Sequence, residues 1–116
     1  MSEVKKSREQ VEDLSALYAR VVLALKQVYD PEIPVNIYDL GLVYELKIRP
    51  GGKVYILMTF TAPNCPMADE VLAEVRHCVE LTPGVKGVEI DLTFEPPWDK
   101  SMLSEEAMLE LGLDPD

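Results

Sequence analysis

Cysteine and histidine are scarce in this chain, and their scarcity removes several kinds of site. The 116 residues include two cysteines, Cys65 and Cys78, and one histidine, His77. The cysteines form no CxxC pair, so a zinc ribbon and a thioredoxin-type redox pair are excluded. Two cysteines also cannot make a disulfide framework, and free thiols in a reducing compartment are expected.

Other signals are missing as well. The sequence has no GxxxxGK[ST] phosphate loop, no GxGxxG fingerprint and no GxSxG elbow. No run approaches the roughly 20 apolar residues that cross a bilayer, and the polar start MSEVKKSREQ does not resemble a signal peptide. We therefore expect a cytoplasmic protein with no membrane partner.

Basic residues are few relative to acidic ones. Eleven Lys and Arg stand against 21 Asp and Glu, which gives a formal net charge of -10. This charge repels the phosphates of nucleic acids, so the expected partners are proteins, cations or neutral ligands and not nucleic acid. The acidity also suits a small protein that only needs to stay soluble, and the charge alone does not distinguish these readings.

Length and composition are those of one globular domain spanning residues 1–116, with 47% hydrophobic and 28% charged residues. A capping box at Ser7 and Gln10 predicts a helix start near residue 8, and Asp30-Pro31 predicts its end. Residues 30–43 lack a clean period, which indicates a structured loop with at most one helical turn. The predicted elements are a helix over 8–29, strands over 44–49 and 53–61, a helix over 66–81, a strand over 88–95 and a helix over 104–111.

This α-β-β-α-β-α order predicts an α+β fold with a three-stranded mixed sheet. A hairpin at Pro50-Gly51-Gly52 joins the first two strands, and a right-handed crossover joins the second to the third. The second strand is apolar on both faces, so it should lie in the centre, with strand order 1-2-3. The helices are expected to pack on one face.

Cys65 is the candidate reactive group. With Pro66 at the first helical position, Cys65 is predicted at the N-cap, where the helix dipole favours thiolate. Nearby carboxylates would oppose this, and a mere capping or packing role stays open. Cys78 shares an apolar stripe and is expected in the core, whereas His77 lies on the wet side, roughly 18 Å along the helix from Cys65. A metal site that combines these three residues is therefore excluded.

A second group of residues is expected at one end of the sheet. If the second and third strands are parallel, the ends of both strands meet at one edge, where ligand sites are common. A shallow pocket would result, although Trp98 could instead only fill the sheet end and Glu95 be solvated. The residues concerned are Thr59, Thr61, Cys65, Glu95, Pro96, Pro97 and Trp98.

Three segments resemble the signature of one family. They are DPEIPVNIYDLGLV (30–43), TFTAPNCPMADE (59–70) and LTFEPPWD (92–99). The chain is similar over about residues 15–110 to the SufT-like iron-sulfur assembly factors, a former domain-of-unknown-function family that includes the eukaryotic cytosolic targeting factor and PaaD. The chain ends in a short acidic tail without the cysteine-rich segment of PaaD-like members, and it has no P-loop domain like that of the fused carrier proteins.

The resemblance implies an auxiliary, non-enzymatic role in iron-sulfur protein maturation. The implied partners are an assembly scaffold or carrier and client proteins, and a homodimer is left open. The cofactor is also open, transient iron or an iron-sulfur cluster being the candidates, with Cys65 as the transient metal ligand. The motif residues fall on Asp30, Pro31, Glu32, Asn36, Asp39, Leu40, Gly41, Thr59, Thr61, Cys65, Pro66, Glu95, Pro96, Pro97 and Trp98.

Ligand number limits how such a role could work. A cluster normally needs about four protein ligands, and this chain offers one exposed cysteine. Cys65 could bridge a cluster with a second subunit or with a partner's thiols, carry persulfide, or only guide docking. The competing hypotheses are a metal-free adaptor that binds scaffold and client, and a thiol enzyme, which lacks an evident general base.

Overall fold

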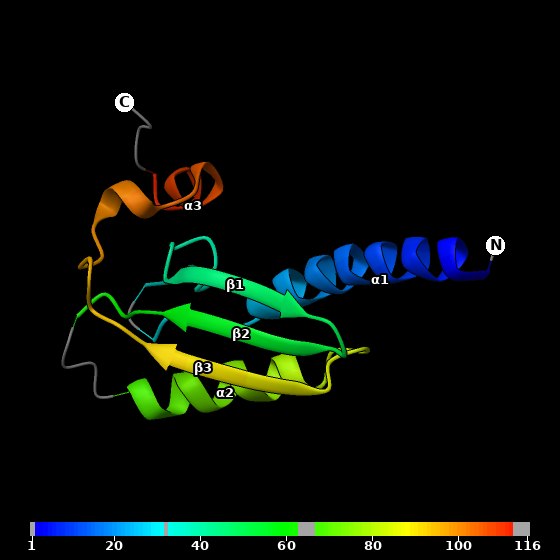
Figure 1. Ribbon diagram of the computed structural model, residues 1–116. Helices are drawn as coiled ribbons and strands as arrows, with labels where there is room; N and C mark the ends of the chain where they lie inside the picture. The colour runs from blue at the N-terminus through cyan, green and yellow to red at the C-terminus, as the bar shows by residue number, and fades with distance from the viewer. Residues whose placement is uncertain (1, 32, 63–66, 113–116) are drawn as a thin grey trace.

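The computed structural model describes residues 2–31, 33–62 and 67–112, with side chains from residue 14 onward. Figure 1 shows a three-stranded sheet with two helices behind it and a C-terminal segment that rises past one end of the sheet. The elements are α1 (Ser2–Leu25), β1 (Val43–Arg49), β2 (Lys53–Met58), α2 (Ala68–Glu80), β3 (Gly87–Leu92), a 3-10 helix η1 (Lys100–Met102) and α3 (Glu105–Glu110).

The sheet confirms the predicted α+β topology. Strand order is β1-β2-β3, with β1 antiparallel to β2 and β2 parallel to β3. Because side chains alternate across a strand, Val54, Ile56 and Met58 of β2 enter the core while Tyr55 and Leu57 lie on the opposite, open face. β2 is the central strand, as its two apolar faces predicted.

One hydrophobic core joins the sheet to the helices. α1 contributes Leu17, Val21 and Leu25, which have at most 5% of their surface exposed. α2 contributes three valines at a spacing of four residues, which is the period of one helix face. These side chains pack against β2 from one side, so α1 and α2 cover a single face of the sheet (Figure 1). The α2 valines are Val71, Val75 and Val79.

The predicted bounds of the first helix are wrong at both ends. α1 begins at Ser2, because residues 2–7 contain no glycine or proline and continue the helical run, so Ser7 is not its cap. At the other end the helix stops at Leu25 instead of residue 29. The Ile37 N–H donates to the Val28 carbonyl and Tyr29 bridges to Asn36, so the chain is already extended before Pro31.

β2 and β3 are both shorter than predicted. The Thr59 N–H still donates to the Leu42 carbonyl, and the Thr93 N–H to the Met58 carbonyl, so pairing persists for one residue beyond each strand. Phe60 then turns into the core, whereas Phe94 lies exposed. The alternation of apolar and polar residues in the sequence therefore continues for two or three residues beyond the last strand pairing.

The C-terminal segment crosses the sheet end where β2 and β3 finish and reaches the β1 side (Figure 1). Its last helix, α3, has Ser104 as its N-cap, with the Ser104 hydroxyl accepting from the Ala107 N–H. α3 matches the predicted helix, whereas η1 was not predicted. Among the described residues, no helix is long and apolar enough to cross a membrane.

Candidate functional site

Two of the three motif segments are joined directly. The indole N–H of Trp98 donates to the Leu40 carbonyl at 2.6 Å, and the Ser104 N–H donates to the Asp39 carbonyl at 2.8 Å. Both bonds connect the loop of residues 30–42 to the segment that follows β3. Trp98 is half-buried and packs against the core, so it holds this loop in place while the sheet end is filled.

Polar side chains of the loop are largely used to build the loop itself. The Asn36 amide donates to an Asp39 carboxylate oxygen at 2.8 Å, and the Asp39 N–H donates back to the Asn36 side-chain oxygen at 2.8 Å. Asp30 is buried and accepts from the Ile33 N–H at 2.9 Å. Such local bonds stabilise a turn, which explains why these residue types occur at this spacing.

Gly41 lets the loop touch the C-terminal segment. Its φ is +81°, a conformation that side chains disfavour, and a Cβ at this position would collide with the backbone of Met102. The close approach brings η1 against the loop. The glycine of the DLG motif is therefore required by both backbone conformation and space.

We predict that Gly41→Ala destabilises the fold by about 3 kcal/mol, because strain at positive φ adds to the collision with Met102. Gly51→Ala is the matched control, since Gly51 also has positive φ but has nothing within 4 Å of its Cβ position. The control should cost only about 1 kcal/mol. Urea unfolding measures both, and equal costs would show that the contact with Met102 contributes nothing.

Tyr44 follows this glycine at an irregular point of β1. The pairing register shifts between Val43 and Glu45, and such a bulge re-aims the side chain within it. The Tyr44 hydroxyl donates to the Pro96 carbonyl at 2.7 Å and contacts the Met102 sulfur at 3.6 Å. Burial raises the pKa of Tyr44, a hydrogen bond with Thr59 opposes this, and the Asp99 carboxylate raises it further. The Tyr44 hydroxyl therefore connects β1 to the segment that follows β3.

A shallow hollow of about 590 Å³ opens beside Tyr44. It lies where the loop, the start of β1 and the segment after β3 meet. Carboxylates stand at its border, but the described residues contain no group of three metal-ligating side chains. The hollow is open to solvent, and the described residues that line it do not form a metal site. Its lining residues are Gly41, Val43, Tyr44, Glu45, Leu57, Glu95, Pro96 and Met102.

The remaining motif residues occupy different environments. Thr59 is fully buried and Thr61 is half-buried, so the two threonines do not present matching hydroxyls to solvent. Glu95 is exposed and is joined to Pro96 by a cis peptide bond. Two further prolines of the motifs, Pro31 and Pro97, are exposed. Glu32, Cys65 and Pro66 lie outside the described residues.

The predicted cap of the second helix is wrong. α2 begins at Ala68 with Met67 as its N-cap, and no side chain caps the helix. The helix starts two residues later than Pro66 predicted, so Cys65 precedes the N-cap by two positions in sequence. Cys78, which was predicted in the core, is half-buried and packs against the core without belonging to its buried residues.

Cys65 should react with a small alkylating reagent before Cys78. Burial raises the pKa of the Cys78 thiol, and the Glu74 carboxylate raises it further. Because thiolate is the reactive form, Cys78 should become modified mainly as pH rises toward that raised pKa or after denaturation. Mass spectrometry of native protein at neutral pH checks this order. Modification of Cys78 first would overturn the assignment of Cys65 as the reactive thiol.

Tyr44 and Met102 were not foreseen as site residues. The sequence places Tyr44 in a regular alternation with Leu46 and Ile48, and nothing in that pattern reveals a bulge. Met102 lies beyond the third motif, in a 3-10 turn that has no periodic signal. The one available hint is Gly41, because a glycine required at positive φ indicates that another backbone segment approaches closely.

Comparison with known proteins places these features in a family. A family model described as "Iron-sulfur cluster assembly protein" matches residues 18–92, which include the first two motif segments and end where the third begins. The chain is 62% identical over 92 residues to a Porphyromonas gingivalis protein named "Fe-S protein maturation auxiliary factor", covering 79% of this chain and 88% of that protein.

Two further relatives agree. Fe-S protein maturation auxiliary factor YitW of Bacillus subtilis is 38% identical over 98 residues, covering 84% of this chain and 96% of YitW. A crystal structure of a domain of unknown function from Bacillus anthracis superposes with a TM-score of 0.81 at 31% identity, covering 90% of this chain and 99% of that one. The chain therefore belongs to the iron-sulfur cluster assembly protein family, with the SufT-like auxiliary factors among its relatives.

Proposed function

We propose that this chain acts in the cytoplasm as an auxiliary factor in iron-sulfur cluster assembly or in the maturation of iron-sulfur proteins, without an enzymatic reaction of its own. Cys65 serves in this proposal as a transient thiolate ligand or persulfide carrier. The observation that carries the role is the family match over residues 18–92, together with the 62% identity to a maturation auxiliary factor.

The ligand count supports transient handling of a cluster over storage. An iron-sulfur cluster normally needs about four protein ligands. His77 is exposed on α2, and Cys78 packs toward the core. The described residues therefore do not supply the further ligands that a cluster bound to Cys65 would need. The cluster is then cargo, and its other ligands come from a scaffold, a client or the Cys65 of a second subunit.

The position of the connecting loop favours such sharing. The chain leaves β2 after Met58 and enters α2 at Ala68, so the loop between them starts at the sheet end that the C-terminal segment crosses (Figure 1). The hollow beside Tyr44 opens at the same end of β2. A partner that seats part of its surface in the hollow would then lie at the sheet end where residues 59–62 begin the connection to α2.

The hollow also favours a second candidate, a metal-free adaptor that binds scaffold and client. Its border of exposed Glu95 and Pro96 suits protein contacts whether or not a thiol takes part. In the adaptor hypothesis the joined loop and C-terminal segment carry the contacts, and Cys65 is dispensable.

Deletion of the native gene tests the proposed role. Cells without the gene should show low activity of iron-sulfur enzymes under iron limitation or oxidative stress, while enzymes without clusters keep their activity. Expression of this chain should restore the lost activity. Full activity of the iron-sulfur enzymes in the deletion strain under both stresses would contradict both the assembly role and the adaptor role.

A further inference from the structure

The outer edge of β3 has the features of an unprotected sheet edge. β3 pairs only with β2 among the described residues, so its other side carries no strand. The Thr93 N–H donates to β2, and by the two-residue period Val88, Ile90 and Leu92 direct their backbone groups outward. In agreement, the Arg76 guanidinium donates to the Val88 carbonyl at 2.8 Å from outside the sheet.

The opposite edge of the sheet is protected in ways that β3 is not. β1 has an irregular register near Glu45, and it bears the basic residues Lys47 and Arg49. The irregular register and the basic side chains each discourage the pairing of a further strand. β3 keeps a regular register through all six residues and contains no proline, and its two charges, Glu89 and Asp91, are both acidic, so they would repel an acidic strand but attract a basic one. Of its outward groups, the Val88 carbonyl is the one that a described side chain covers.

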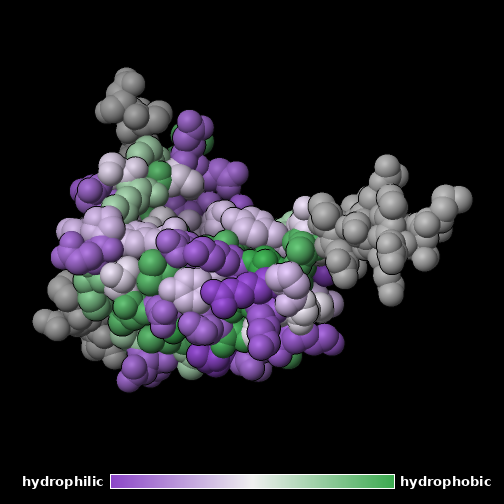
Figure 2. All heavy atoms as spheres, viewed as in Figure 1, coloured by the Kyte–Doolittle hydropathy of each residue, from purple (hydrophilic) through white to green (hydrophobic). Residues whose placement is uncertain are grey.

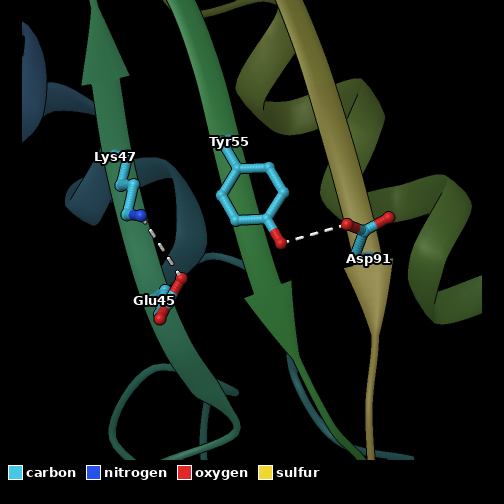
Figure 3. Close-up of polar contacts among 4 residues, drawn as sticks. All are labelled: Glu45, Lys47, Tyr55 and Asp91. Carbon is cyan, nitrogen blue, oxygen red and sulfur yellow. Dashed lines mark hydrogen bonds and ion pairs between the residues drawn. The ribbon is translucent and has the colours of Figure 1, made fainter.

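Charge is divided across the open face of the sheet. Figure 3 shows Lys47 paired with Glu45 on β1, at 3.7 Å, and the Tyr55 hydroxyl donating to Asp91 on β3, at 3.0 Å. The cationic groups of Lys47 and Arg49, both on β1, also lie 6.0 and 5.9 Å from the centre of the Tyr55 ring. On β3 the exposed acidic side chains, Glu89 and Asp91, have no ion-pair partner among the described residues. On this face β3 itself therefore bears only acidic charges, while Arg49 and Lys53 line a hollow together with Glu89.

Apolar side chains lie on the other side of the same edge. A surface groove of about 240 Å³ lies between α2 and β3. Leu92 is 42% exposed, and Phe94, just past the strand, is 36% exposed. Figure 2 shows apolar side chains interleaved with hydrophilic ones along this border of the molecule. The groove is lined by Leu72, Ala73, Arg76, Ile90 and Leu92.

We propose that the β3 edge binds an extended segment of a partner protein in which basic and apolar side chains alternate. The segment adds a fourth strand, its backbone bonding the outward groups of Ile90 and Leu92. Its apolar side chains enter the groove beside Leu72, and its basic side chains face Glu89 and Asp91. A second copy of this chain is a poorer occupant, because antiparallel β3 strands centred on Ile90 would set Glu89 against Asp91.

The test uses a labelled ten-residue peptide that alternates valine and lysine, with fluorescence anisotropy as readout. Two control peptides are used. In the first, glutamate replaces every lysine, which reverses the charge. In the second, proline replaces the central valine, which keeps the charge but blocks strand pairing. We expect the lysine peptide to bind at least tenfold more tightly than either control. Equal binding of the proline peptide would reduce the effect to general attraction by an acidic protein and overturn the proposal.

A pair of charge reversals locates the site. Glu89→Lys with Asp91→Lys should weaken binding at least tenfold, whereas Glu106→Lys with Glu110→Lys, on α3 beyond the opposite edge, makes the same change in net charge and should have a much smaller effect. All four side chains are exposed. Equal loss in both double variants would overturn the proposal.

Amide hydrogen exchange of the unmodified protein gives a measurement that does not depend on the variants. The lysine peptide should slow exchange of the Ile90 and Leu92 amides at least tenfold. The same protection without peptide, growing with protein concentration, would assign the edge to self-association and overturn the proposal. The proposal does not rest on the assembly role, so Cys65→Ser should bind the peptide as tightly as the original sequence.

Discussion

Cys65→Ser should leave the deletion strain with no more iron-sulfur enzyme activity than an empty vector gives. Serine keeps the size of the side chain but removes the soft thiolate that iron and clusters prefer. The change should alter the free energy of unfolding by no more than about 0.5 kcal/mol, because Cys65 is not the N-cap of α2. Enzyme assays in extracts, with immunoblots for protein level, measure the effect.

Cys78→Ser is the matched control for this substitution. Cys78 packs against the core and its thiol is disfavoured as thiolate, so it should rescue activity as long as the protein accumulates. Rescue by Cys65→Ser as well would favour the adaptor. Replacing Trp98 or Asp39 then needs care as a test of adaptor contacts, because both residues also hold the loop of residues 30–42 in place.

Trp98→Ala should destabilise the protein by about 3 kcal/mol, because a large packed side chain and its hydrogen bond are both lost. Trp98 packs against the core and donates to the Leu40 carbonyl, which lies in a fully buried residue. Trp98→Phe keeps most of the packing but leaves that carbonyl without its donor, and should cost about 1–2 kcal/mol. Denaturant unfolding measures both.

Phe94→Ala is the control for the loss of an aromatic ring nearby. Phe94 lies four residues earlier and is exposed, so its removal should cost less than about 1 kcal/mol. A similar cost for Trp98→Ala and Phe94→Ala would show that Trp98 does not hold the loop. Loss of amide protection at Ile37 and Leu42 in Trp98→Phe would support the role of the indole hydrogen bond.

The sheet could be predicted from the sequence because its physics is local. Alternation in residues 44–49 and 88–92, and the apolar faces of 53–58, each indicate a strand without any tertiary knowledge. The helix ends are harder. α1 stops early because Tyr29 pairs with Asn36, a contact that only the folded loop makes, and α2 starts late even though Pro66 suits a first helical position.

The candidate site was only partly predictable. The chain order correctly indicates that the ends of β2 and β3 meet, since Thr93 pairs with Met58 there. The sequence does not show that Trp98 bonds to Leu40 or that Tyr44 sits in a bulge, because both depend on long-range contacts. Spacing alone could not choose between Trp98 as a pocket wall and Trp98 as a filler of the sheet end. The structure favours the second, because Trp98 packs against the core and does not line the hollow beside Tyr44.

Activation of an apo iron-sulfur enzyme, followed without oxygen, tests the central claim most directly. A cluster-loaded scaffold is mixed with the apo enzyme in the presence or absence of this protein, and the recovery of activity is timed. The proposed role predicts faster activation with the original sequence and with Cys78→Ser, and no acceleration with Cys65→Ser. The same activation rate with and without the original protein would contradict it.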